Sequence, residues 1–224
     1  MNKTKSKLKI LIVVFLVLMA LISLTNLPML EYEGEIVKPA GLSVLIGLAA
    51  YFITASTNEK KNEGLNIKTF PKQLMDWKLL VLLLIPTIIN IITWYVTDPL
   101  IPGYVDHLTG RTDILDPAKM GTTILTLVVA ALGEEIANRA FFQKQLGKIT
   151  GFVPSILITS LFFAAAHFSP GDVITVAYDL SLIFINSVFY GLVFKRTDNA
   201  WCSWVSHLLA NITGFILMYA YIYK

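Results

Sequence analysis

The sequence predicts an all-α fold: a polytopic bundle of about seven transmembrane helices that forms a single domain over residues 1–224. The chain is 55% hydrophobic and only 15% charged, with a mean hydropathy of +0.67, which is too apolar for a soluble domain of this length. Several apolar runs approach the roughly 20 residues that a helix needs to cross a bilayer. Lysine and arginine collect between alternate runs, as they do in cytoplasmic loops.

Charge and cysteine content narrow the possible partners. The net charge of +3 provides no basic field for nucleic acid, so the lipid bilayer is the partner that composition predicts. Cys202 is the single cysteine, which excludes an intrachain disulfide and a thiolate metal cluster.

The first three spans are predicted at 10–29, 38–56 and 79–97. The first follows a lysine-rich start that also resembles a signal peptide, but no small-x-small cleavage site follows, so we expect an uncleaved helix with a cytoplasmic N-terminus. The acidic linker "EYEGE" is expected outside, and the lysine-rich loop 58–78 inside. A segment rich in proline, glycine and aspartate after the third span is typical of an external loop.

Four more spans and two short cytoplasmic loops are predicted in the second half. The spans are 117–146, 152–168, 173–194 and 201–223, and the loops are 147–151 and 195–199. All lysine-rich loops then lie on one side, and the chain is expected to be a multi-pass cell-membrane protein.

Two adjacent carboxylates and an arginine lie inside the fourth predicted span. A charge at the bilayer centre costs on the order of 3 kcal/mol, so these side chains need an explanation. Glu135 and Arg139 are four residues apart with the acid first, which favours an ion pair. Glu134 lies about 100° around the helix, and its own i+4 neighbour is the uncharged Asn138.

This difference predicts two roles for the two carboxylates. Without a cation, Glu134 is suited to accept and return a proton as a general base, whereas Glu135 and Arg139 form a structural pair. The alternative is that all three residues are polar contacts between helices or line a water-filled conduit. The motif alone leaves both interpretations open.

Two histidines on apolar helices favour the catalytic interpretation over the packing interpretation. "FAAAH" ends at His167 and "HLLAN" begins at His207, and together with Glu134 they form a candidate catalytic set. His207 and Asn211 are four residues apart, so an imidazole and an amide can point at one spot and stabilise an oxyanion.

"EEIANR", "FAAAH" and "HLLAN" resemble the E-E-x-x-x-R, F-x-x-x-H and H-x-x-x-N motifs of the CPBP intramembrane proteases, also called the CAAX protease and bacteriocin-processing or Abi family. Order and spacing agree over residues 122–213, and the first 120 residues match only as hydrophobic helices. Asn138 replaces a usually apolar residue, and Ala140 replaces a frequent glycine. Neither change removes a reacting group, although Asn138 can alter the proton affinity of Glu134.

The resemblance implies an intramembrane endopeptidase that acts on a membrane-associated peptide or protein. In this mechanism Glu134 and His167 activate a water, and His207 and Asn211 stabilise the tetrahedral oxyanion. Members of the family are commonly called metalloproteases, and Glu134, His167 and His207 are the ligands that a zinc ion would use. The H-E-x-x-H helix is missing, so we favour catalysis without a metal cofactor.

Other classes of membrane protein fit less well. The chain contains no glycine-serine elbow of a rhomboid-like protease. Tyr178-Asp179 matches half of the aspartyl type, but no G-x-G-D follows, and Asp179 is expected near the external interface or hydrogen-bonded to a neighbour. A transporter is expected to show matched repeats, which are not found. A non-catalytic immunity or partner-binding protein of the same fold remains the main alternative.

Catalysis requires the motifs to converge, and their expected depths differ. At about 1.5 Å per residue, Glu134 lies roughly 19 Å and His167 roughly 22 Å from the cytoplasmic helix ends, but His207 only about 9 Å from Trp201. We expect the segment before the seventh span to dip into the protein, or the sixth span to end deeper. The four side chains should then lie within about 10 Å of one another.

Overall fold

The computed structural model is almost entirely helical. It describes residues 9–10, 12–14, 17, 30–32, 35–37, 42–57, 64–110 and 120–223. The elements are β1 (Leu30–Tyr32), β2 (Glu35–Val37), α2 (Leu42–Thr57), α3 (Phe70–Gln73), α4 (Trp77–Leu100), α5 (Tyr104–Gly110), α6 (Met120–Glu135), the π-helix η2 (Ile136–Gln143), α7 (Lys144–Thr150), α8 (Phe152–Ala165), α9 (Val173–Thr197) and α10 (Ala200–Ile222).

Three of the described helices are long and apolar enough to cross a membrane. They are Trp77–Thr97 within α4, Val173–Thr197 (α9) and Ala200–Ile222 (α10), and α8 is a shorter apolar helix. The prediction of a helical fold with membrane-spanning helices is therefore confirmed to the extent of three candidate spans, while the count of seven spans stays a prediction. The first predicted span, 10–29, lies almost wholly outside the described residues.

Several predicted boundaries were wrong. The expected single helix 117–146 is divided into α6, η2 and α7, because the backbone changes to π-helical bonding directly after Glu135. The expected external loop contains α5, and the expected cytoplasmic loop 58–78 contains α3. The acidic linker contributes to an antiparallel pair in which Leu30 faces Val37, so the fold is not purely helical.

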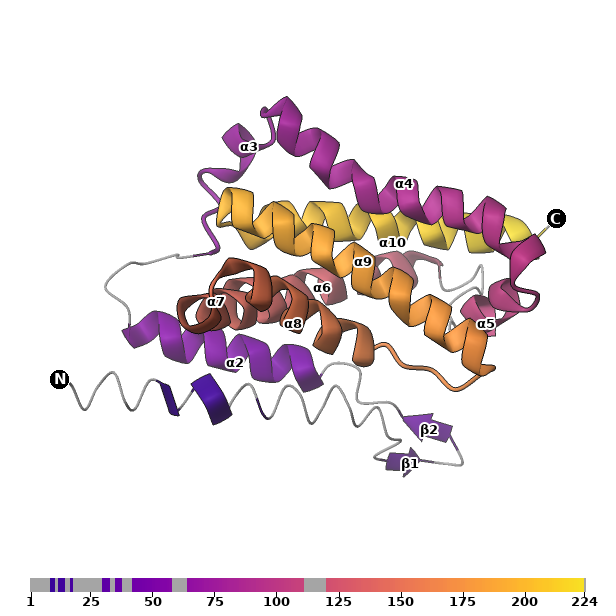
Figure 1. The fold of residues 1–224 in the computed structure, drawn as a ribbon, viewed down its shortest axis with the longest axis horizontal. Helices are drawn as coiled ribbons and strands as arrows, with labels where there is room; N and C mark the ends of the chain where they lie inside the picture. Colours follow the sequence, from indigo (N-terminus) through magenta and orange to yellow (C-terminus); the bar gives the residue numbers. More distant parts are fainter. Residues whose placement is uncertain are drawn as a thin grey trace.

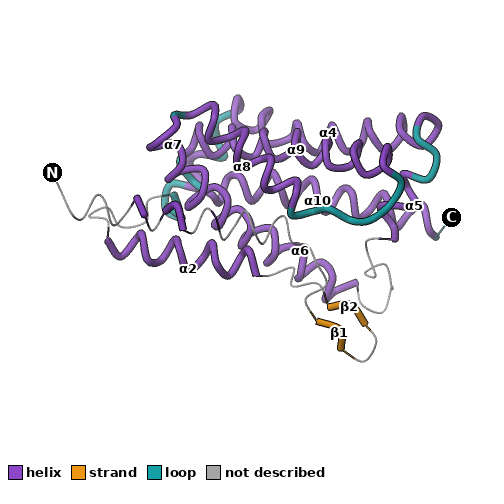
Figure 2. Tube along the Cα trace, turned by 60° about the horizontal axis from the view of Figure 1, so that its bottom comes forward, coloured by secondary structure: helices purple, strands orange, loops and turns teal. Residues whose placement is uncertain are grey.

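Helix α10 lies at the centre of the bundle. It packs against α4, α6 and α9, while α8 packs against α9 (Figure 1). Helix α2 packs against η2 and α6. It lies on the side of the bundle that is away from α4 (Figures 1 and 2). The contact is close at Gly47, where any side-chain carbon would clash with Ala137 of η2. The bundle therefore surrounds the segment that carries the two glutamates.

The segment 64–77 covers Asn199 in the turn between α9 and α10, whereas Asp198 of the same turn is exposed. Asp198 adopts a left-handed conformation (φ 47°) that ends α9, and Asn199 is fully buried. The Asn199 amide donates to the carbonyl of Asn66 (2.9 Å) and to Oε1 of Gln73 (2.8 Å). The covering segment buries Asn199, and the predicted dip of the preceding residues into the protein stays a prediction.

Asp76 and Asp172 begin α4 and α9 as N-caps. The hydrogen bond from the Arg196 side chain holds the pKa of the Asp76 carboxyl below its ordinary value. The backbone N–H of Thr175 does the same for the pKa of Asp172. Both caps therefore depend on ionised carboxylates.

Candidate active site

Glu134 and Glu135 end α6 in different environments. The Glu134 side chain is 22% exposed, whereas that of Glu135 is completely buried. The chain then continues as a π-helix, a rare form that is frequent at functional sites. The Asn138 side-chain amide donates to the backbone carbonyl of Glu134 (2.9 Å), which supplies a donor where α-helical bonding ends.

The ion pair expected from the i+4 spacing is present. Arg139 Nε donates to Glu135 Oε2 at 3.1 Å, and both side chains are wholly buried. The other guanidinium nitrogens donate to Gln143 Oε1 (3.3 Å) and to Ser187 Oγ (2.7 Å). The guanidinium also lies over the ring of Phe163, 5.6 Å from its centroid. Arg139 therefore connects three helical segments around one buried carboxylate.

A second contact fastens η2 to α9. Gln143 Nε2 donates to the Gly191 carbonyl (3.0 Å), and a side-chain carbon on Gly191 would lie only 2.8 Å from Gln143 Oε1. The sequence analysis did not identify Gln143 or Ser187 as part of the site. Two patterns were available as signals: Gln143 follows Arg139 by four residues, and Ser187 and Gly191 are small residues one turn apart.

His207 lies between the two glutamates. Its Nδ1 is 3.0 Å from Glu135 Oε1, and its Nε2 is 3.8 Å from Glu134 Oε2. Because a carboxylate only accepts, Nδ1 carries the proton, and Nε2 faces Glu134. Tyr190 stacks on the imidazole, with ring centroids 4.7 Å apart and an interplanar angle of 18°. His207 is therefore buried against Glu134 and faces away from lipid, as the proposed convergence requires.

Phe163 contacts both motif histidines. His167 Nδ1 is 2.8 Å from the Phe163 carbonyl oxygen, so this nitrogen donates and Nε2 is left to accept. The Phe163 ring centroid lies 4.6 Å from that of His167 and 5.6 Å from that of His207. Phe163 was recognised only as the first residue of the F-x-x-x-H motif. In the structure its ring contacts both imidazoles.

Asn211 lies one turn after His207 on α10 and is partly exposed. The structure brings together Glu134, Glu135, Arg139 and His207 by direct contacts. No hydrogen bond among the described residues joins His167 or Asn211 to Glu134. Their alignment on a substrate therefore stays a prediction.

Known proteins share the part of the chain that carries these contacts. Residues 116–213 match the family model of the Rce1-like type II CAAX prenyl endopeptidases. This match confirms the resemblance to the CPBP family that the three motifs indicate.

The chain is also similar to a Mycoplasma protein over part of its length. A protein of Mycoplasma capricolum subsp. capricolum, described only as uncharacterized, is 33% identical over 102 residues, which are 45% of this chain and 28% of that protein. The chain therefore matches less than a third of the length of that relative. No solved structure matches the chain.

The described side chains that could bind zinc in residues 116–213 do not come together as a metal site. Glu134 and His207 approach each other, but no three His, Cys, Asp or Glu side chains in the described part of the chain are close enough to hold a metal ion. In this conformation no zinc site is therefore assembled from Glu134, His167 and His207.

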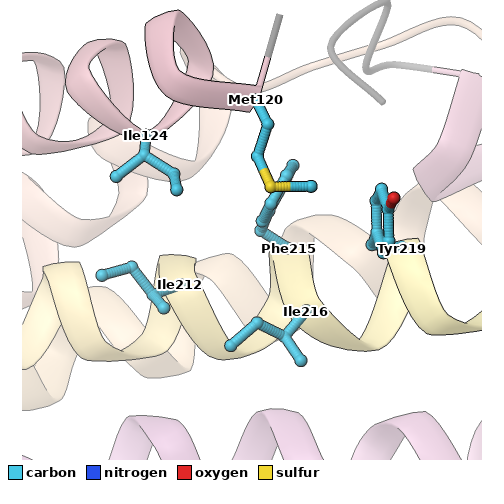
Figure 3. Close-up of a pocket in the computed structure, with 6 residues that line it drawn as sticks. All are labelled: Met120, Ile124, Ile212, Phe215, Ile216 and Tyr219. Atoms are coloured by element: carbon cyan, nitrogen blue, oxygen red, sulfur yellow. The ribbon is translucent and has the colours of Figure 1, made fainter. Parts of the chain in front are cut away.

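An apolar pocket of about 290 Å³ lies between α6 and α10. Figure 3 shows side chains from both helices around it, and none is a predicted catalytic residue. The lining residues are Met120, Ile124, Ile212, Phe215, Ile216 and Tyr219. Ile212 directly follows Asn211, so the pocket adjoins the oxyanion motif.

Asp179 belongs to a separate polar pair. Its Oδ2 is 3.6 Å from Nε2 of His107 in α5, and both side chains are largely buried. The residue thus has a neighbouring partner, as expected, and lies outside the glutamate and histidine contacts described above.

Proposed function

We propose that the protein is an intramembrane endopeptidase of the CAAX prenyl endopeptidase type, which hydrolyses a peptide bond in a membrane-associated peptide or protein. The observation that carries the proposal is the position of His207. One ring nitrogen is fixed by the buried Glu135, and the other faces the partly exposed carboxylate of Glu134.

Glu134 is proposed as the general base. Among the described residues it has no arginine or lysine partner, in contrast to Glu135, and it is the more exposed member of the pair. In the proposed reaction Glu134 takes a proton from a water that His167 helps to orient, and the water attacks the substrate carbonyl. The protonated Glu134 then returns the proton to the leaving amine.

His207 and Asn211 are proposed to stabilise the oxyanion. With Nδ1–H committed to Glu135, His207 needs a second proton on Nε2 to donate to the oxyanion. Glu135 holds the Nδ1–H of His207 in place while the oxyanion forms, and Glu134 is neutral at that stage because it carries the proton taken from water. Asn211 would supply an amide N–H as the second donor.

No cofactor is proposed. If Glu134 acts directly on water, cleavage should continue in the presence of a strong chelator. Inactivation by o-phenanthroline followed by recovery with zinc would show that the metal-dependent alternative is correct.

The test of the function is Glu134→Gln, which keeps shape and hydrogen bonding but cannot accept the proton of water. Membrane proteomes of cells that carry wild type or Glu134→Gln are compared for a peptide that accumulates uncut, and a prenylated CAAX peptide is the first purified probe. We expect cleavage to be lost while folded yield stays near normal. Asp179→Asn is the matched control, because it removes a membrane carboxylate outside the site. Equal loss of folded yield in Glu134→Gln and Arg139→Ala would favour the non-catalytic alternative.

A further inference from the structure

A second polar cluster lies on the side of α10 that faces α4. Ser206 Oγ donates to the Leu83 carbonyl (2.8 Å), and Asn90 Nδ2 donates to the Ala210 carbonyl (3.2 Å). Ser206 and Ala210 are one turn apart, so these two bonds follow one face of α10. Neither bond involves the glutamates or histidines of the candidate active site.

The orientation of the two amides in this cluster follows from the Ala210 carbonyl. That carbonyl only accepts, so Nδ2 of Asn90 must face it, and Oδ1 of Asn90 faces the other way. Asn186 Nδ2 donates to this Oδ1 at 2.8 Å. The Oδ1 atom of Asn186 then points away from Asn90. It is buried and has no hydrogen-bond partner among the described residues.

Thr87 provides a second buried polar atom without a partner. Its hydroxyl has none in the described part of the chain. Thr87 is four residues after Leu83 and three before Asn90, and both of these residues contact α10, so it lies on the same face of α4.

We propose that Thr87, Asn90 and Asn186 form a binding site for at least one ordered water between α4, α9 and α10. Buried polar atoms are satisfied in almost all native proteins, and an internal water is the usual partner when protein atoms do not suffice. A water can donate to Asn186 Oδ1 and exchange a hydrogen bond with the Thr87 hydroxyl. An apolar ligand would leave both atoms unsatisfied.

The water site lies next to the imidazole of the candidate active site. Asn186 is four residues before Tyr190, which stacks on His207, and Ala210 is three residues after His207. The cluster is therefore about one helical turn from the stacked pair. Hydrolysis consumes one water per bond, and hydrocarbon supplies none, so a water held here forms a local reserve. This role in hydrolysis rests on the proposed function, whereas the binding of water does not.

The test compares Asn186→Ala with Asn186→Leu. Alanine leaves space beside Asn90 and Thr87, so water stays; leucine has the branched shape of asparagine but is larger and apolar, so it excludes water. Water cross-relaxation at the Thr87 side chain is measured by NMR in protein labelled with ¹³C-threonine, because Thr87 is a partner of the proposed water and is kept in both variants. We expect a water cross-peak in wild type and Asn186→Ala, and none in Asn186→Leu. Cleavage should fall at least tenfold further in the leucine variant than in the alanine variant.

A packing role predicts the reverse order, because leucine fills the space and alanine leaves a cavity. Loss of folding or cleavage in Asn186→Ala with retention in Asn186→Leu would therefore overturn the proposal, as would the lack of a cross-peak in wild type. If Asn186→Leu does not fold, Thr87→Val and Thr87→Ser replace it. The water cross-peak is then read at the Asn186 side-chain amide in protein labelled with ¹⁵N-asparagine, and only valine should weaken it. A cross-peak with equal cleavage in both asparagine variants would refute the reserve role. A wild-type protein that cleaves nothing would refute the proposed function, and the NMR result would still decide the water site.

Discussion

Replacing Arg139 with alanine should destabilise the protein strongly. The guanidinium is wholly buried and donates to Glu135, Gln143 and Ser187. Its removal leaves Glu135 as a buried carboxylate whose remaining partner is Nδ1 of His207. One neutral imidazole N–H does not compensate a full negative charge in a low-dielectric interior.

The expected loss is about 3–5 kcal/mol, the range for breaking a buried ion pair by removing one partner. For a chain of this size, 1 kcal/mol shifts a thermal midpoint by about 2–4 °C, so the midpoint should fall by roughly 6–20 °C. Ser187→Ala is the matched control. It removes one of the bonds to Arg139 and should cost only about 1–2 kcal/mol.

The double variant Glu135→Gln, Arg139→Ala separates stability from activity. Neutral glutamine removes the unpaired charge, so part of the lost stability should return. Cleavage should not return, because His207 loses its carboxylate partner. The measurement is thermal denaturation of protein purified in detergent, combined with a peptide-cleavage assay. A midpoint for Arg139→Ala within about 2 °C of wild type, less than the shift for 1 kcal/mol, would refute the assignment of Arg139 as the structural counter-ion.

Four further predictions concern the scaffold. Asn199→Asp should reduce folded yield and cleavage more than Asn199→Ala, because aspartate keeps the N-cap acceptor for Trp201 N–H but places a buried negative charge against the oxygens of Asn66 and Gln73; the reverse order would contradict these contacts. Gly47→Leu should lower the denaturation midpoint by several degrees because α2 cannot then approach η2, and an unchanged midpoint would contradict that contact. The lowered pKa values of Asp76 and Asp172 mean that their contribution to stability is complete above about pH 4 and is lost as the pH falls through the lowered values. Midpoints measured from pH 7 to 3 should therefore stay level and then fall, and an earlier fall would point to other groups. On a Cys202→Ser background, a cysteine at position 62 should resist an impermeant reagent in intact cells, and labelling there would reverse the predicted topology.

Hydropathy predicted the long helices well. The last span was expected at 201–223 and forms Ala200–Ile222, and the sixth was expected at 173–194 and forms Val173–Thr197. These segments are long and apolar, so the cost of transfer from water to hydrocarbon determines their limits. Short polar elements such as α5 carry no such signal, which is why they were assigned to loops.

Spacing within one helix predicted the site only in part. Glu135 and Arg139 were recognised because their i+4 separation places them on one face regardless of tertiary structure. Ser187 accepts a further hydrogen bond from the Arg139 guanidinium, but it lies on α9, 48 residues later in the sequence. The π-helix that carries Arg139 was also unpredicted, because residue spacing was interpreted on an α-helix, and Gln143 in this π-helix contacts α9.

The expected depth of His207 raises the question of how a polar segment could extend a membrane bundle. A straight helix from Trp201 would place His207 only about 9 Å from a cytoplasmic surface, and α10 begins just one residue earlier than that. Helix α10 is therefore about as long as expected, and the segment 64–77 covers Asn199 at its start. Asn199 is fully buried because Asn66 and Gln73 accept its amide hydrogens, so the protein continues beyond the end of the helix. Irregular backbone is tolerated at such depth only where protein or water satisfies it, and the covering segment supplies those partners. Hydropathy assigned that segment to a solvated loop because of its lysines, and these are exposed, but Asn66 and Gln73 also accept hydrogen bonds from Asn199, the N-cap residue of α10. We therefore expect loss of these contacts to disturb the start of the helix that carries His207.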